Sequence, residues 1–331
     1  MKKIIYKATA VSPANIAFIK FWGKKDPEIN IPFNDSISMN LSRCLTTTTV
    51  EFNSSYLLDR IVVGGKEVSE AKKERVVKIL DQVRKRSNLK LKAKVISKNN
   101  FPEGAGIASS ASAFSALALA ASSTGKLSLS LKELSILSRH GSGSACRSVV
   151  DGFAQWQVGD SDTTSYAVQI AAPDFWELRD IVCVVSKEEK KVSSTEGHGL
   201  ATSSPYFKTR LKILPEKISK LKEAFFRKDF RTFGQIVEEE AVDLHMMAMT
   251  SSPPIFYWNE GTMEIIQAVQ TWRENGLLVY FTMDAGPNVH LICLKKNVAQ
   301  VSKEIKKSKN VLFTIINKPC EGSCLSKEHL F

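Results

Sequence analysis

The order of strands and helices expected after residue 174 constrains the fold more than any other feature of the chain. Apolar runs and helical periodicities follow one another there as β-α-β-β-α-β, the split βαβ order of ferredoxin-like domains. Strands are expected at 181–185, 278–283, 289–294 and 311–316. Helices are expected at 217–226, 230–247, 263–274 and 298–307. The C-terminal part is therefore predicted to be an α+β unit.

The N-terminal part mixes hairpins with helices. The runs 46–52 and 60–68 are typical of strands, and Gly64-Gly65 bends the second run into a hairpin. Apolar residues at helical spacing predict a helix at 71–86, and alternation of apolar residues with lysines predicts a strand at 89–95. This half is therefore predicted to be α+β as well.

The length of the chain predicts two domains, with one large domain or three small ones as alternatives. At about 150 residues per domain, 331 residues suit two units. The pattern changes near residue 175, so we expect an N-terminal domain at 1–175 and a C-terminal domain at 176–331.

Charge favours an acidic ligand. The formal net charge is +12, of which the part before Trp176 carries +9, with 24 basic and 15 acidic residues. Such an excess suits phosphorylated small molecules or nucleic acid. The lysines show no interleaved aromatic residues and no nucleic-acid recognition motif, so we expect a small-molecule substrate and no nucleic acid.

No secretory or membrane segment is expected. Lys7 interrupts the first apolar stretch after three residues. The longest uncharged run, 104–125, has 22 residues, but ten of them are Gly, Ser or Thr. The chain is therefore expected to make no membrane contact.

The cysteines and histidines suggest structural roles. Six cysteines are scattered through apolar surroundings, which favours buried thiols and a cytoplasmic location. Cys320 and Cys324 are the only close pair, and a disulfide or a metal there stays open. The five histidines, including His198, show no ligand spacing and are interpreted as structural.

The segment Phe101-Pro-Glu-Gly-Ala-Gly-Ile-Ala-Ser-Ser-Ala111 joins a strand to a helix through glycines and small residues. Glycines allow close approach of backbone to phosphate, and a helix start offers free N–H groups. The hydroxyls of Ser109 and Ser110 suit phosphate oxygens or Mg²⁺. An ordinary loop before a closely packed helix is the alternative.

A second glycine- and serine-rich segment, Gly141-Ser-Gly-Ser-Ala-Cys-Arg147, places an arginine one helical turn beyond its glycines. The guanidinium fork can hold a carboxylate or a phosphate at two points. The alternative is a turn whose arginine pairs with a structural carboxylate.

Two further charged residues lie in apolar surroundings. Asp284 ends an apolar strand before Gly286-Pro287, where turn chemistry is the alternative to a site. Lys20 follows an apolar run beside Phe21 and Trp22, so it either extends to water or lies in a site.

Together these residues resemble the kinase superfamily named for galactokinase, homoserine kinase, mevalonate kinase and phosphomevalonate kinase (GHMP). Within it the chain most resembles the diphosphomevalonate decarboxylase family, from about Ser12 to the last strand. The segment around 102–111 resembles the superfamily phosphate loop. The specific markers are Asn15-Ile-Ala-Phe-Ile-Lys20-Phe-Trp-Gly-Lys24, Gly141-Ser-Gly-Ser-Ala-Cys-Arg147-Ser148, Val192-Ser-Ser-Thr-Glu-Gly197 and Asp284-Ala-Gly-Pro-Asn288.

The resemblance implies a two-lobed GHMP-kinase-like α+β fold. Its N-terminal lobe would be ribosomal-protein-S5-domain-2-like and bind ATP, and its C-terminal lobe would be ferredoxin-like. The implied enzyme uses ATP and Mg²⁺ to phosphorylate the 3-hydroxyl of 5-diphosphomevalonate, after which phosphate and CO₂ leave and isopentenyl diphosphate forms. A cytoplasmic homodimer serving isoprenoid biosynthesis by the mevalonate pathway is also implied.

The resemblance also implies roles for individual residues. Catalytic roles fall on Asp284, which would orient the hydroxyl, Lys20, which would keep Asp284 ionised, and Arg147, which would hold the substrate. Substrate contacts are implied for Asn15, Phe21, Trp22, Lys24, Ser142, Ser144, Arg147 and Ser194. ATP contacts are implied for Gly104, Gly106, Ala108, Ser109 and Ser110, with Ser110 also a candidate Mg²⁺ ligand through Mg-ATP.

Two departures from the family pattern affect substrate recognition. The family usually has Tyr where this chain has Phe21, so one hydroxyl contact to substrate phosphate is lost. The segment 245–254 keeps the family's His and Pro-Pro but lacks the usual Asp-Thr before them. A 5-phosphomevalonate decarboxylase, a mevalonate 3-kinase and a non-catalytic ligand-binding protein on the same scaffold stay as alternatives. Asp284 together with Lys20 favours the decarboxylase.

Overall fold

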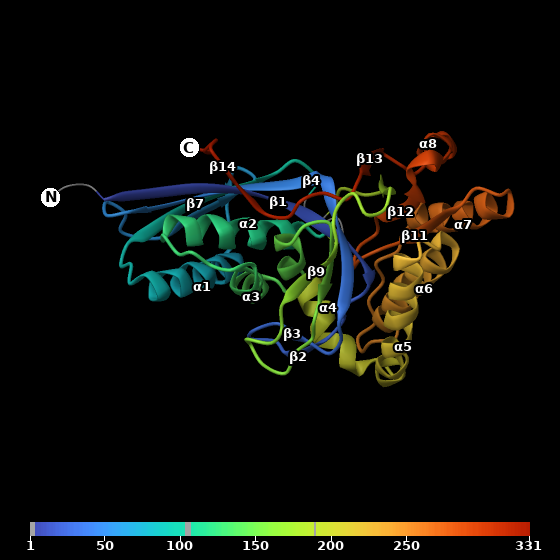
Figure 1. Cartoon of the computed structure of the whole chain (residues 1–331), viewed down its shortest axis with the longest axis horizontal. Helices are drawn as coiled ribbons and strands as arrows, with labels where there is room; N and C mark the ends of the chain where they lie inside the picture. The colour runs from blue at the N-terminus through green and yellow to red at the C-terminus, as the bar shows by residue number, and fades with distance from the viewer. Residues whose placement is uncertain (1–3, 103–106, 189) are drawn as a thin grey trace.

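Two sheets, one in each half of the chain, organise the described residues, which are 4–102, 107–188 and 190–331 in this computed structural model. Figure 1 shows the larger sheet on the left, with α1 (Glu70–Ser87), α2 (Ser109–Thr124) and α3 (Leu131–Gly141) beneath it. The smaller sheet lies on the right with the helices of the C-terminal half. The expected α+β class is confirmed.

The larger sheet has eight strands in the order β14-β1-β4-β7-β5-β6, with β8 paired to β4 and β9 to β8. Their bounds are β1 (Ile5–Ile19), β4 (Ser36–Asn53), β5 (Arg60–Val63), β6 (Lys66–Glu67), β7 (Lys92–Asn99), β8 (Phe153–Trp156), β9 (Ala167–Ala171) and β14 (Cys324–Ser326). A separate short hairpin joins β2 (Lys24–Asp26) to β3 (Ile31–Pro32).

Two strands of this sheet are longer than the sequence indicated. The strand expected at 46–52 is the second part of the 18-residue β4, and β1 was not expected as a strand. The register between β1 and β4 shifts between Pro13 and Asn15, where the proline cannot donate to the ladder. Because of this irregularity, the sequence pattern did not indicate the 15-residue strand β1. Lys20 follows the end of β1 directly and is buried.

The smaller sheet has the order β11-β12-β10-β13, with every pairing antiparallel. Its strands are β10 (Leu178–Val184), β11 (Val279–Thr282), β12 (Val289–Leu294) and β13 (Phe313–Asn317). This is the strand order of the ferredoxin-like split βαβ arrangement, which confirms the prediction.

The helices of the C-terminal half are α4 (Ser194–Leu200), α5 (Phe207–Phe226), α6 (Phe230–Met249), α7 (Glu260–Glu274) and α8 (Val298–Ile305). Helix α5 begins ten residues before the expected start at 217 and contains Pro215. A proline removes one hydrogen bond from a helix. The helix nevertheless continues through Pro215, because burial of Phe207 and Leu214 stabilises its first half.

The two halves share a core and a strand. Phe18 of β1 packs edge-on against Phe233 of α6, with ring centroids 5.0 Å apart. The end of the chain returns to the first half, where β14 pairs antiparallel with β1 and Thr9 lies opposite Ser326. The N-terminal sheet is therefore completed by the last residues of the chain, and the domain boundary near 175 stays a prediction.

Helix α2 is the apolar centre of the N-terminal half. Small residues such as Ala116 and Ala120 are fully buried and allow it to lie close to β1 and β4. Within the described ranges, neither α2 nor any other helix has the combined length and apolar character needed to span a bilayer.

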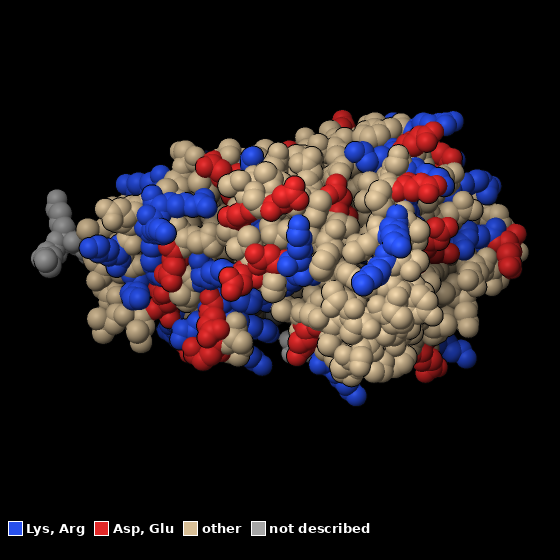
Figure 2. All heavy atoms as spheres, turned by 90° about the horizontal axis from the view of Figure 1, so that it is seen from below, with Lys and Arg blue, Asp and Glu red and all other residues tan. Residues whose placement is uncertain are grey.

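Figure 2 shows Lys and Arg interspersed with Asp and Glu over the N-terminal half of one face, and a largely uncharged area over the C-terminal half. Six basic residues line a cavity between the halves, which is described below.

Candidate active site

One cavity between the two halves gathers most of the residues that the sequence singled out. Its walls come from the end of β1, the start of α2, the 3₁₀ turn at 143–149, α4 and the turn after β11. Its predicted lining residues are Lys20, Phe21, Trp22, Lys24, Ala108, Ser109, Ser110, Ser142, Ser144, Arg147, Ser194 and Asp284. Residues scattered over more than 260 positions of the sequence thus meet in one place.

The cavity is strongly basic. Among the described residues that line it, six are basic and one is acidic. The acidic residue is Asp284, and the basic ones are Lys20, Lys24, Lys72, Arg75, Arg147 and Lys190. Such a concentration of positive charge in a recess attracts ligands with several negative charges.

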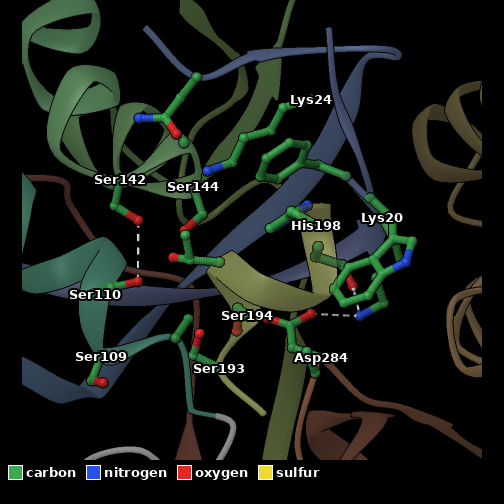
Figure 3. A pocket seen from close by; sticks show the side chains of 18 of the residues that line it. Lys20, Lys24, Ser109, Ser110, Ser142, Ser144, Ser193, Ser194, His198 and Asp284 are labelled. Carbon is green, nitrogen blue, oxygen red and sulfur yellow. Dashed lines mark hydrogen bonds and ion pairs between the residues drawn. The ribbon is translucent and has the colours of Figure 1, made fainter. Parts of the chain in front are cut away.

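Asp284 and Lys20 form an ion pair at one wall of the cavity (Figure 3). The Lys20 Nζ donates to Asp284 Oδ1 at 2.9 Å and to the Ala17 carbonyl at 2.6 Å. Lys20 is fully buried, whereas the Asp284 side chain is 24% exposed to the cavity. Burial opposes ionisation of Asp284, but the charge and hydrogen bond of Lys20 hold its pKa below the ordinary value. The pair therefore presents an ionised carboxylate to a ligand.

A buried ion pair behind Lys20 fixes its backbone. Glu240 of α6 accepts a hydrogen bond from the Lys20 N–H at 3.0 Å. Arg210 of α5 donates to the Lys20 carbonyl at 3.0 Å and to Glu240 at 2.7 Å. Since the Arg210 and Glu240 side chains are almost completely buried, the C-terminal half fixes the Lys20 backbone and so the position of Lys20 relative to Asp284.

Arg147 lies in a cradle of neutral oxygens. Its guanidinium donates to Ser36 Oγ at 2.5 Å, to Ser38 Oγ at 2.9 Å and to Asn15 Oδ1 at 3.0 Å. It is 2% exposed, and among the described residues it makes no ion pair. The structural alternative, a carboxylate partner for Arg147, is therefore wrong. A buried cation without a counterion is costly, which favours an anionic ligand as its partner.

Asn15 does not line the cavity, although it was predicted to contact substrate. It is buried behind Arg147, and its amide nitrogen donates to Ser148 Oγ at 2.8 Å and to the Ser144 carbonyl at 3.2 Å. Its oxygen accepts from Arg147. Asn15 therefore holds the arginine and the serine segment together rather than facing the ligand.

The two glycine- and serine-rich segments meet in the cavity. Ser110, at the start of α2, and Ser142 lie with their hydroxyl oxygens 3.1 Å apart, as Figure 3 shows. Ser109 and Ala108 also line the cavity, whereas Gly104 and Gly106 lie outside the described residues. Hydroxyls and free N–H groups at a helix start suit phosphate oxygens.

Two protein-family models match this chain, one in each half. A family model described as the diphosphomevalonate decarboxylase-like N-terminal domain matches residues 12–167. A second, the mevalonate 5-diphosphate decarboxylase C-terminal domain, matches residues 180–322. This chain belongs to the diphosphomevalonate decarboxylase family. The family and the enzyme class predicted from the sequence are thereby confirmed.

Diphosphomevalonate decarboxylases of fungi are similar along most of the chain. The Aspergillus fumigatus enzyme is 36% identical over 92% of this chain and 81% of its own length. The Saccharomyces cerevisiae enzyme is 35% identical over 90% of this chain and 80% of its own.

Solved structures of the same family share the fold. Mevalonate diphosphate decarboxylase from Staphylococcus aureus superposes with a TM-score of 0.92 at 37% identity, over 98% of this chain and 99% of that one. A complex of the protein designated MDDEF with MVAPP, AMPPCP and magnesium gives the same TM-score at 36% identity, with the same coverage. The predicted GHMP-kinase fold is therefore confirmed.

Two lysines that line the cavity of this decarboxylase-family chain have lowered pKa values. Burial, followed by the charges of Arg75 and Lys78, lowers the pKa of Lys24 to about 8. Burial also lowers the pKa of Lys190 to about 8, against the opposing effect of Asp284. The Lys190 ammonium donates to the Ala285 carbonyl and to Ser194 Oγ. Both lysines therefore have a pKa of about 8, well below that of an ordinary lysine.

The aromatic wall of the cavity contains Phe21, Trp22 and His198. The Phe21 ring stacks on His198 with centroids 4.0 Å apart and contacts the edge of Trp156 at 4.8 Å. A Cβ placed on Gly143 would lie 3.0 Å from the tip of the Phe21 ring. The ring tip therefore points at the segment that carries Ser142 and Ser144.

Three basic cavity residues were not singled out from the sequence: Lys72 and Arg75 of α1, and Lys190. His198 was interpreted as structural. His198 lines the cavity, and its Nδ1 accepts a hydrogen bond from the Gly23 N–H. Among the other histidines, His140 bonds to Asp162, His290 to Asp180 and His329 to Thr9, and His245 packs against Trp258.

In this structure all six cysteines are free thiols, including the close pair Cys320 and Cys324. Four of them are buried, as expected: Cys44, Cys146, Cys183 and Cys293. Within the described ranges, no group of His, Cys, Asp and Glu could hold a metal ion by itself.

Proposed function

We propose that this chain catalyses the ATP-dependent decarboxylation of 5-diphosphomevalonate to isopentenyl diphosphate, with release of ADP, phosphate and CO₂. The observation that carries the proposal is the cavity itself, in which six basic residues surround a single carboxylate paired with a buried lysine. A substrate with a diphosphate and a carboxylate, together with ATP, matches that charge.

Asp284 is proposed to orient the 3-hydroxyl of the substrate. Its Oδ2 has no hydrogen-bond partner among the described residues, so it can accept a hydrogen bond from the hydroxyl. An ionised aspartate is a weak base for an alcohol, but in a loose phosphoryl-transfer transition state the proton leaves late and orientation matters more. Loss of phosphate then builds positive charge at C3. The electrons of the breaking C–C bond quench this charge and form the double bond as CO₂ leaves.

Substrate binding is proposed to use basic and hydroxyl groups that line the first cavity. Arg147 would hold the carboxylate or diphosphate through the N–H groups that its cradle leaves unused. Lys24, Ser142, Ser144 and Ser194 would contact phosphate oxygens, and Phe21 and Trp22 would exclude water. Asn15 acts as a positioning residue for Arg147.

ATP is proposed to bind across the start of α2. A second, mostly apolar cavity shares Ser109, Ser110, Lys72 and Arg75 with the first. Its apolar walls include Ile61, Val63, Val68, Val76 and Val95. The nucleobase would occupy these walls, which places the phosphates at Ser109, Ser110 and the first cavity.

The side chains of the cavity could hold Mg²⁺ only when it is bound to the phosphates of ATP. The cavity offers the Ser110 hydroxyl, and the described residues form no acidic cluster that would bind the ion alone. Mg²⁺ usually takes phosphate oxygens and water together with few protein ligands. It would neutralise charge on the ATP phosphates, with Ser110 as its protein ligand.

Location and oligomeric state are proposed from the family resemblance. We propose that the enzyme works in the cytoplasm, where its buried free thiols would also stay reduced. A homodimer is proposed on the same basis.

The substrate decides between this proposal and the nearest alternative. With ATP and Mg²⁺, 5-diphosphomevalonate should release CO₂ and ADP in equal amounts, and its kcat/KM should exceed that of 5-phosphomevalonate. The Phe21→Tyr variant should lower KM by about two- to tenfold with the same product, because one hydrogen bond to substrate is gained. A ratio of kcat/KM below one would favour a 5-phosphomevalonate decarboxylase. ADP formed without CO₂ would favour a 3-kinase.

The lowered pKa values of Lys24 and Lys190 predict that substrate binding weakens as the pH rises above about 8. A lysine with a pKa of about 8 is charged below that pH and neutral above it. The KM for 5-diphosphomevalonate should therefore rise by about tenfold between about pH 7.5 and about pH 9.5. The Lys24→Arg variant should flatten this rise, because arginine stays charged. A KM that falls with pH, or an identical rise in the variant, would contradict the assignment.

A further inference from the structure

His198 is a cavity residue to which the function above assigns no role. It lies on α4, one turn after Ser194, and lines the same cavity as Asp284 and Arg147. Figure 3 shows it in the middle of the site, away from Ser109 at the start of α2.

The hydrogen bond to one ring nitrogen fixes where the proton lies. The Gly23 N–H donates to His198 Nδ1 at 3.0 Å, so Nδ1 is the unprotonated nitrogen. The neutral ring then carries its proton on Nε2. Gly23 has a φ of +91°, a conformation that glycine adopts readily, and this conformation turns its N–H toward the histidine.

The other ring nitrogen is open to the cavity. Nε2 of His198 has no hydrogen-bond partner among the described residues. It is not enclosed by protein, unlike Nε2 of His245 and of His290, which are buried without partners. The Nε2–H of His198 is therefore available to a ligand.

Two aromatic rings hold the imidazole in place. Phe21 stacks on it at 4.0 Å with an interplanar angle of 26°, and Trp22 lies at 4.8 Å with an angle of 40°. With Nδ1 bonded to Gly23, rotation of the ring is restricted. A donor that is already oriented loses little entropy on binding.

The surroundings keep this donor neutral. Burial, and then the charges of Lys24, Lys190 and Arg147, hold the pKa of His198 well below its ordinary value. A protonated ring would also direct a second N–H at the Gly23 N–H. His198 is thus a neutral donor among cations, in a place that an anionic group must occupy.

We propose that the Nε2–H of His198 donates a hydrogen bond to a phosphate oxygen of the substrate's diphosphate, which makes His198 a determinant of affinity for that group. The inference rests on the proposed function. Lys24 and Arg147 near the ring would bring the diphosphate there, whereas the ATP phosphates belong with Ser109 and Ser110 across the cavity.

The test compares two replacements of the ring. His198→Phe keeps the stacking surface and removes both nitrogens, and it should raise the KM for 5-diphosphomevalonate by about ten- to a hundredfold, the loss of one hydrogen bond to a charged acceptor. Its KM for ATP should change by less than about twofold. His198→Gln keeps a side-chain N–H donor and should recover most of the affinity. His329→Phe, outside the cavity, is the matched control and should behave as wild type.

Further readouts separate the contact from a structural effect. The ratio of the His198→Phe and wild-type KM values should stay constant between about pH 6 and about pH 7.5, since the donor does not titrate there. An unchanged KM, a rise in KM for ATP instead, or equal impairment of the Phe and Gln variants would overturn the proposal. Calorimetric binding of 5-diphosphomevalonate is measured in parallel. Wild-type protein that binds it without releasing CO₂ would refute the proposed function, and the variants would still test the contact.

Discussion

Replacing Asp284 with asparagine is expected to lower kcat by about 10²- to 10⁴-fold, the usual contribution of a positioned acid–base group. The amide keeps the shape of the side chain but loses the negative charge that orients the 3-hydroxyl and pairs with Lys20 at 2.9 Å. Affinities for ATP and substrate should stay within about tenfold, because the charge acts mainly in the transition state.

The measurement is CO₂ release under saturating substrate, with a thermal midpoint to detect any effect of leaving buried Lys20 without its partner. Asp174→Asn is the control, since Asp174 is exposed and outside the cavity. More than a few per cent of the wild-type kcat in the Asp284 variant would move the role to another group.

The Arg147→Lys variant is expected to lower kcat/KM by about a hundredfold, although the charge is kept. The guanidinium bonds at once to Asn15, Ser36 and Ser38, and it still has N–H groups left for a ligand. A single ammonium cannot satisfy these three partners and hold a planar anion as well. A hundredfold loss corresponds to about 2.7 kcal/mol, within the range for one charge-assisted contact.

Arg231→Lys provides the comparison, because Arg231 is exposed on α6 and away from the cavity. Substrate KM and kcat are determined for both variants. Kinetics indistinguishable from wild type in Arg147→Lys would leave the arginine with a structural role only, held by its cradle.

Site residues could be predicted from the sequence where a short segment around them has an unusual composition. Lys20, Arg147 and Asp284 each lie in a run whose composition is unusual, such as a lysine after an apolar strand or an aspartate before Gly-Pro. The ferredoxin-like order was predictable for a similar reason, since its strands and helices are regular and their periodicities are clear.

The remaining features depend on packing between distant parts of the chain. Lys72 and Arg75 look like the wet face of a helix, and only the placement of α1 beside α2 brings them to the cavity. Asn15 lies in a motif that suggested a ligand contact, yet the fold puts it behind Arg147. His198 carries no local signal, because its partner Gly23 is 175 positions away.

The return of β14 to β1 has a consequence for the site. The Gly322 N–H bonds to Asp151 at 2.7 Å, and a Cβ at Gly322 would lie 2.3 Å from the Val149 carbonyl, so the returning segment is seated where only glycine fits. The residues between β9 and β14 are thus an insertion between two strands of the larger sheet. Because β1 lies between β14 and β4, residues that follow the insertion close one edge of the sheet whose strand β1 leads directly into Lys20.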